Sequence, residues 1–122
     1  MQYVRATFAL AAFVILAAAC GEGQQGARAL TEAESAALAP AHPRLAELYE
    51  TSCKACHTVR ASLAPLAGDR TQWDARWAAG EDALLRAAIT GKNGMPAGGQ
   101  CVPCTPDDLR GLTRFMAARE DG

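Results

Sequence analysis

The chain has 122 residues, with 12 Lys and Arg against 13 Asp and Glu, so its formal net charge at pH 7 is -1. A charge this small gives no argument for binding nucleic acid or an acidic substrate. The length favours one compact domain, and it excludes a two-lobed α/β enzyme or a barrel enzyme.

The N-terminal segment predicts export. One positive charge lies within residues 1–5, and residues 6–19 contain no charged side chain. This apolar run suits a secretory signal peptide over residues 1–19 but is short for a membrane span. Its small residues lead into Cys20, which resembles the lipobox of bacterial lipoproteins. We therefore expect a lipoprotein on the periplasmic side, held to the membrane through lipidated Cys20. Ordinary cleavage that leaves Cys20 free is the alternative.

Residues 20–41 are predicted to form a flexible tether. The segment 21–26 is rich in glycine and has no apolar periodicity, which is typical of a mobile chain. Within the tether, Thr31 and Glu34 have the spacing of a capping box, so they could start a short helical turn. The folded domain is then predicted to occupy residues 42–122.

That domain is poor in large apolar side chains. Domains of this size bury little surface, and those that are stable often contain a disulfide, a metal or a bulky cofactor. We therefore expect another group in the core, beside the aromatic residues Tyr49, Trp73, Trp77 and Phe115.

The sequence Cys53-Lys54-Ala55-Cys56-His57 identifies that group. Its C-x-x-C-H pattern is the attachment motif of c-type haem. The two thiols can reach the two vinyl groups of one porphyrin while the adjacent imidazole lies beneath the iron. We therefore predict one covalent haem c, attached through Cys53 and Cys56, with His57 as an iron ligand. The alternative is a disulfide between these cysteines followed by an unrelated histidine.

A second C-x-x-C pair is formed by Cys101 and Cys104. Together with the first pair it could supply four thiolates to a structural zinc ion. The gap between the pairs is longer than in compact zinc ribbons, however, and exported thiols tend to oxidise. We therefore predict a Cys101–Cys104 disulfide that stiffens the loop before the last helix.

A haem iron bound by His57 also needs a ligand on its other face. Met116 has helical spacing with apolar neighbours, which favours a core position. Met95 lies in the loop 91–99, which has no helical or strand pattern and can present a thioether to iron. His42 precedes the proline at the predicted start of a helix, which favours an exposed position. Met95 is therefore the predicted second ligand.

The remaining pattern predicts an all-α fold of about four helices around the haem. Apolar spacing and end signals place these helices at residues 43–57, 71–79, 81–90 and 105–119. The last helix has Thr105 as its cap, a proline at its first position and acidic residues in its first turn. No segment alternates as a persistent strand would.

Several motifs follow one another in a familiar order. They are Cys53-x-x-Cys56-His57, Ala64-Pro65, Gly68-Asp69, Trp73-x-x-Arg76, Gly94-Met95-Pro96, the Cys101 and Cys104 pair, and Thr105-Pro106-Asp107-Asp108-Leu109. Over residues 45–118 the chain resembles a class I c-type cytochrome, and its extra cysteine pair resembles the cytochrome c5-like group.

This resemblance implies the small cytochrome c fold and roles for particular residues. The Pro65 carbonyl would accept the ring N–H of His57, fixing the orientation of the imidazole. Cys101 and Cys104 would form a disulfide. Arg76 would contact a haem propionate. Trp73 and Trp77 are expected to be core residues, with a propionate contact as the alternative.

The loop after the haem histidine departs from the family. Arg60 and Leu63 stand where the family commonly has glycines, and neither adopts a positive φ without cost. We therefore expect this loop to take another path, which would alter the exposed haem edge. Lys54 and Arg60 are candidates for a docking rim, although isolated charges are more often solvated surface.

These features predict a one-electron carrier that cycles between Fe(III) and Fe(II) with His57 and Met95 as axial ligands. With both axial positions filled, we expect no small-molecule substrate and no enzymatic activity. Its partners would be redox proteins that bind transiently, not nucleic acid. Two alternatives are a haem enzyme or gas-binding sensor with an open distal site, and a membrane-tethered subunit of a larger oxidase or reductase.

Overall fold

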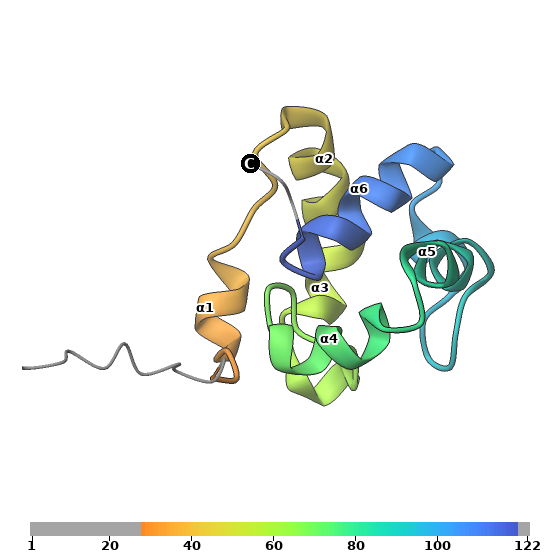
Figure 1. Cartoon of the computed structure of the whole chain (residues 1–122). Helices are drawn as coiled ribbons and strands as arrows, with labels where there is room; N and C mark the ends of the chain where they lie inside the picture. Colours follow the sequence, from red (N-terminus) through yellow and green to blue (C-terminus); the bar gives the residue numbers. More distant parts are fainter. Residues whose placement is uncertain (1–27, 120–122) are drawn as a thin grey trace, which may run out of the picture.

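The computed structural model describes residues 28–119, which form a bundle of helices (Figure 1). Within this range the one β-type pairing is an isolated bridge between Lys92 and Met95. The predicted signal peptide, Cys20 and the first part of the predicted tether lie outside the described residues. None of the helices in residues 28–119 has both the length and the apolar character needed to cross a bilayer.

The first described helix, α1 (Glu32–Ala36), begins with a complete capping box between Thr31 and Glu34, as their spacing predicts. The tether prediction is wrong over residues 28–41, because this segment packs against the domain. Ser35 is 0% exposed, and Leu38 packs against the core. The sequence pattern did not predict this packing, because α1 has no periodic apolar face. It contacts the domain through Ser35 and through Leu30 and Leu38, which flank the helix.

The first helix of the predicted domain contains three segments. The helix α2 (Pro43–Leu48) begins with a proline at its first turn, and the π-helical segment η1 (Tyr49–Cys53) follows it directly. The last segment, α3 (Lys54–His57), carries the C-x-x-C-H motif. The predicted helix from 43 to 57 is therefore present, with a π turn just before the histidine. Such turns are often found at functional sites.

The later helices lie close to their predicted ranges. Asp69 caps α4 (Arg70–Trp77), whose first residue precedes the predicted start by one. The helix α5 (Glu81–Thr90) has the predicted bounds, and α6 (Pro106–Met116) starts with a Thr105 and Asp108 capping box but ends before the predicted residue 119. Two short 3-10 turns are η2 (Arg60–Ser62) and η3 (Ala97–Gln100).

The core lies where the first helix of the domain packs against α6. The rings of Tyr49 and Phe115 meet edge to face with their centroids 4.9 Å apart. Gly111 permits the close approach of the two helices, since a Cβ there would lie 2.8 Å from Cδ1 of Leu45. On the other side of α6 lies α5, joined to it by ion pairs from Glu81 to Arg110 and Arg114. This packing fixes the end of α3, and with it His57.

Candidate haem-binding site

The attachment motif lies at the end of the first helix of the domain. Cys53 is buried in η1, whereas Cys56 is exposed in α3, and both are free thiols. Burial raises the pKa of the Cys53 thiol to about 11. The His57 side chain is also buried. One helix end therefore presents two unpaired sulfurs and one imidazole, the donor set that a covalent haem requires.

His57 is oriented by the residue that the family resemblance indicates. Its Nδ1 lies 2.8 Å from the carbonyl oxygen of Pro65. A carbonyl can only accept, so Nδ1 carries the proton and Nε2 keeps its lone pair. Burial, together with the positive charge of Arg76, lowers the pKa of His57 despite this hydrogen bond. The imidazole is therefore neutral at neutral pH, as a metal ligand must be.

Both tryptophans occupy the positions expected of core residues. The indole of Trp73 stacks on the His57 ring with centroids 5.9 Å apart, and its Nε1 donates to the Leu66 carbonyl at 2.8 Å. That N–H is therefore committed to the backbone. Trp77 is half-buried, and the guanidinium of Arg119 lies 5.5 Å from its ring centroid.

Arg76 is exposed on α4, and its guanidinium donates to the carbonyl of Gln72. Its charge nevertheless reaches the His57 imidazole, because it contributes to the lowered pKa of that ring. The propionate contact predicted for Arg76 stays a prediction.

Met95 is held by its backbone. Lys92 and Met95 exchange two N–H···O bonds of 3.0 Å each. Gly91 has a φ of +81°, and a Cβ there would lie 2.8 Å from the Met95 carbonyl oxygen and 2.9 Å from the Ala97 nitrogen. Because glycine alone fits this close approach, Gly91 holds the loop that carries Met95.

The rival ligands have other surroundings. Met116 is buried in the hydrophobic core, as its helical spacing predicts. His42 is exposed at the start of α2, and its side chain makes no capping hydrogen bond. Of these three residues, Met95 alone is a half-buried thioether in a loop.

Cys101 and Cys104 are paired as a disulfide, with their Cα atoms 5.3 Å apart. This pairing removes two of the four thiolates that a zinc site would need. Across residues 28–119, no three His, Cys, Asp or Glu side chains gather as metal ligands. The four-cysteine zinc alternative therefore has no support in the described part of the chain.

The loop between His57 and Pro65 was expected to avoid a positive φ at Arg60 and Leu63, and at Leu63 it does not. Leu63 adopts the left-handed conformation, with a φ of +62°, and its side chain is 91% exposed. The loop therefore accepts at Leu63 the conformation that glycine would adopt more easily. Arg60 is bound to the N-terminal segment through Leu30 and Glu32, and Lys54 pairs with Glu50 at 2.7 Å.

One residue at this site has no sequence pattern that points to it. Ser35, in α1, donates from its Oγ to the carbonyl oxygens of His57 and Ala67, at 3.2 Å and 2.8 Å. The capping box beside it indicates a helix start but does not indicate a contact with a segment 22 residues away.

The buried hydroxyl of Tyr49 bears on whether the residues around Cys53 fit a haem. Within the described residues this oxygen has no hydrogen-bond partner. Burial, with a smaller effect from the nearby Cys53, raises the pKa of Tyr49 to about 12. A buried hydroxyl without a partner is costly, which is one sign that a group is missing beside Cys53. The free thiols of Cys53 and Cys56 beside the buried imidazole of His57 supply two attachment points and a nitrogen ligand, so the residues present fit a haem.

The chain is similar in sequence to known proteins. The family described as "Cytochrome C oxidase, cbb3-type, subunit III" matches residues 40–116. A cytochrome c5 of Ectopseudomonas mendocina is 42% identical over 73 residues, which cover 58% of this chain and 84% of the relative. A cytochrome c5 of Azotobacter vinelandii is 40% identical over 67 residues, which cover 53% of this chain and 81% of that relative.

Proposed function

The chain belongs to the class I c-type cytochromes and is cytochrome c5-like, and on that premise we propose that His57 and Met95 are the axial ligands of its single haem c. It is a monohaem electron carrier. The haem supplies one-electron redox chemistry when bound, and the protein sets its attachment, ligands and surroundings. The observation that carries the proposal is the 2.8 Å contact between Nδ1 of the buried His57 and the Pro65 carbonyl, which directs the other ring nitrogen toward a metal.

The role of His57 as a ligand depends on which ring nitrogen carries the proton. With Nδ1 donating to Pro65, the remaining ring nitrogen has the free lone pair that iron requires. The Pro65 carbonyl raises the basicity of the imidazole, and Trp73 packs on its face. Because both contacts resist ring rotation, the ligand keeps one orientation in both oxidation states.

The role of Met95 rests on its rigid loop. The paired bonds with Lys92 and the close approach at Gly91 fix its backbone, while its side chain has no place in the buried core. A thioether ligand favours ferrous iron over ferric iron relative to harder ligands, and so raises the reduction potential. With His57 and Met95 both holding the iron, no iron position would be left for a small-molecule substrate.

The cellular setting is also a proposal. We propose export to the periplasmic side through the signal peptide 1–19 and attachment to the membrane through lipidated Cys20. In that oxidising setting the Cys101–Cys104 disulfide stays formed. Redox proteins would bind transiently as electron donor and acceptor.

The Cys20→Ser variant tests the proposed anchor. We expect it to lose membrane association while its haem spectrum stays unchanged. A protein that stays at the membrane without Cys20, after removal of residues 1–19, would favour a bound subunit of a larger complex.

Visible absorption of the full chain, matured with haem, tests the ligand set. We expect a low-spin spectrum with the weak long-wavelength sulfur-to-iron band, which carbon monoxide leaves unchanged. Met95→Ala should abolish the band, whereas Met116→Leu, which changes a buried methionine of the core, should retain it. A high-spin spectrum that shifts with carbon monoxide would reject the proposed ligands and favour catalysis or gas sensing.

A further inference from the structure

Residues 28–38 form a strap across the side of the domain that carries His57. Figure 1 shows α1 beside the lower part of the bundle, separate from the α2 and α6 crossing. The family match begins at residue 40, so the strap precedes the part of the chain that defines the family. Its contacts with the segment that carries His57 therefore lie outside the family match.

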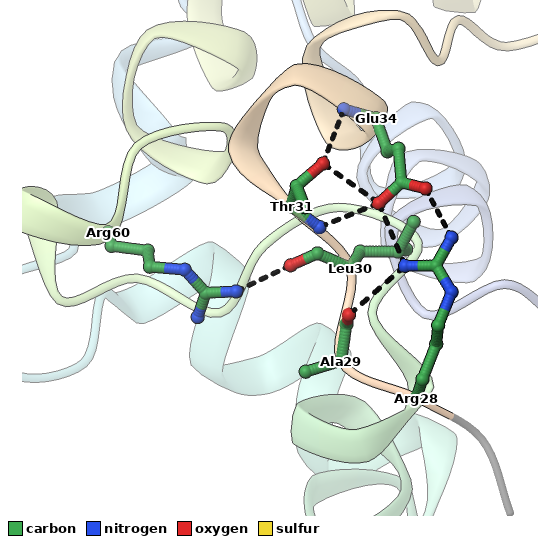
Figure 2. A network of polar contacts seen from close by, with 6 residues as sticks. All are labelled: Arg28, Ala29, Leu30, Thr31, Glu34 and Arg60. Carbon is green, nitrogen blue, oxygen red and sulfur yellow. Dashed lines mark hydrogen bonds and ion pairs between the residues drawn. The ribbon is translucent and has the colours of Figure 1, made fainter.

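The strap has its own polar framework, shown in Figure 2. The Glu34 carboxylate accepts from the backbone N–H and hydroxyl of Thr31, at 2.9 Å and 2.8 Å, and also pairs with Arg28. From the domain, the Arg60 guanidinium donates to the Leu30 carbonyl, and the Arg60 backbone N–H donates to Glu32. The strap is thus attached to the segment that follows His57.

Apolar contact completes the attachment. The side chains of Leu30 and Leu38 lie over Gly68, where even an added Cβ would meet Leu38. Gly68 has a φ of +80°, and its N–H donates to the Met116 carbonyl at 2.7 Å. The strap therefore rests on a backbone surface that leaves no room for a side chain.

Ser35 joins the strap to both ends of the loop that holds Pro65. Its hydroxyl lies 3.2 Å from the carbonyl oxygen of His57 and 2.8 Å from that of Ala67. The same His57 carbonyl accepts the Ala67 N–H at 2.7 Å. A hydroxyl has one proton, which these two acceptors share. Through these two contacts Ser35, which lies outside the loop 57–67, joins the first residue of the loop to the last.

We propose that Ser35 is a positioning residue for the iron ligand His57. By fixing both ends of this loop, the Ser35 hydroxyl keeps the Pro65 carbonyl 2.8 Å from Nδ1 of His57. This inference rests on the proposed ligation by His57. A firm Nδ1–H···O bond makes the imidazole a stronger donor, which favours ferric iron. Loosening the loop therefore favours ferrous iron and raises the reduction potential.

The test compares three variants of the full, haem-loaded chain. Ser35→Ala removes the hydroxyl but keeps a good helix former. Ser35→Thr keeps a hydroxyl. Arg28→Ala removes the exposed ion pair with Glu34 and so weakens the strap without touching the loop. The readouts are the midpoint potential, the proton exchange rate of His57 Nδ1–H by NMR, and unfolding by urea.

We expect Ser35→Ala to shift the ferric-to-ferrous ratio at fixed potential several-fold toward ferrous, where a tenfold shift equals about 59 mV. Exchange of the Nδ1 proton should also become faster. Ser35→Thr should return both readouts toward the parent, and Arg28→Ala should leave both unchanged even if it lowers the free energy of unfolding. This pattern supports a positioning role.

Three outcomes would overturn the proposal. They are an unchanged potential in Ser35→Ala, an equal shift in Arg28→Ala, or a Ser35→Thr protein that retains the Ser35→Ala potential. The second outcome would make the strap a packing element only. A parent protein without the low-spin spectrum of His and Met ligation would reject the proposed ligands, and the two failures are therefore distinct.

Discussion

The indole of Trp73 stacks on the imidazole of His57, with planes 27° apart, while its N–H is bonded to the backbone carbonyl of Leu66. His57 is therefore held on its face by Trp73 and at its edge by Pro65. Trp73 belongs to α4 and its ring packs on His57. It therefore connects α4 to the segment that carries the histidine.

Replacing Trp73 by Phe separates the two functions of the indole. The ring contact with His57 is retained, but the Leu66 carbonyl loses the indole N–H and keeps only the backbone N–H of Asp69, at 3.1 Å. One hydrogen bond is typically worth about 0.5–1.5 kcal/mol, and the smaller ring also leaves a cavity, so we expect the free energy of unfolding to fall by about 1–3 kcal/mol. Urea unfolding of the haem-loaded protein measures the loss, and the absorption spectrum should show unchanged iron ligands.

Trp77→Phe is the matched control on the same helix. Trp77 is half-buried and meets Arg119 through its ring face, a contact that a phenylalanine ring keeps in weaker form. We expect a loss below about 1 kcal/mol. If the free energy of unfolding falls equally in the two variants, the hydrogen bond from Trp73 to Leu66 does not make Trp73 more stabilising than Trp77.

Gly91→Ala should displace the loop that carries Met95. An added Cβ would lie 2.8 Å from the Met95 carbonyl oxygen, and the residue would keep an unfavourable φ of +81°. We expect a loss of about 2 kcal/mol or more and a weakened sulfur-to-iron band. Absorption spectra and urea unfolding measure these two effects.

Gly94→Ala provides the comparison within the same loop. A Cβ at Gly94 meets nothing within 4 Å, and its φ is not in the left-handed region. We expect the parent spectrum and a stability change within about 0.5 kcal/mol. If both glycine variants keep the band, the close approach at Gly91 does not control the position of Met95.

The sequence predicted those parts of the site that are local in the chain. The C-x-x-C-H motif, the helix before it and the cap of α6 depend on neighbours a few residues apart, so their spacing carries the information. The attachment of Ser35 depends on a contact across 22 residues, made by one hydroxyl to backbone carbonyls. Backbone carbonyls have no sequence signature, and a single serine has no periodicity. The strap therefore had the pattern of a tether.

Leu63 illustrates a different limit of sequence reasoning. Its side-chain type argues against a positive φ, yet the loop requires one, because the residues on either side are fixed by η2 and by the Pro65 contact with His57. The side chain is 91% exposed and gains little from packing. The backbone strain is thus tolerated without compensation at this position.

Leu63→Gly should therefore stabilise the protein. Glycine adopts the left-handed region without the Cβ conflict, which costs other residues about 1–2 kcal/mol. Part of this gain is offset by the greater freedom of glycine in the unfolded chain, so we expect a net increase of about 0.5–1 kcal/mol. Leu63→Ala keeps the Cβ and should show no gain in urea unfolding. A gain of the same size in both variants would attribute the effect to the exposed leucine side chain and not to the backbone.

Asp108 predicts an acid-sensitive contribution to stability. The hydrogen bonds from Arg44, at 2.8 Å and 2.9 Å, and those from Thr105 lower the pKa of Asp108 well below its usual value. A lowered pKa in the folded state means that the carboxylate stabilises the protein above the unfolded pKa of about 3.9. This contribution is lost as the pH falls through the folded pKa. Asp108→Asn should therefore be less stable than the parent at pH 5–7.

The difference between the parent and Asp108→Asn should shrink as the pH falls below about 4, because Asp108 of the unfolded chain is protonated there while the folded state still holds it charged. Urea unfolding at a series of pH values measures this convergence. Asp107→Asn is the control, since Asp107 is exposed in the same first turn of α6 and lies outside the Arg44 pair. A difference for Asp108→Asn that stays constant down to pH 2 would mean that geometry, and not the carboxylate charge, makes this residue stabilising.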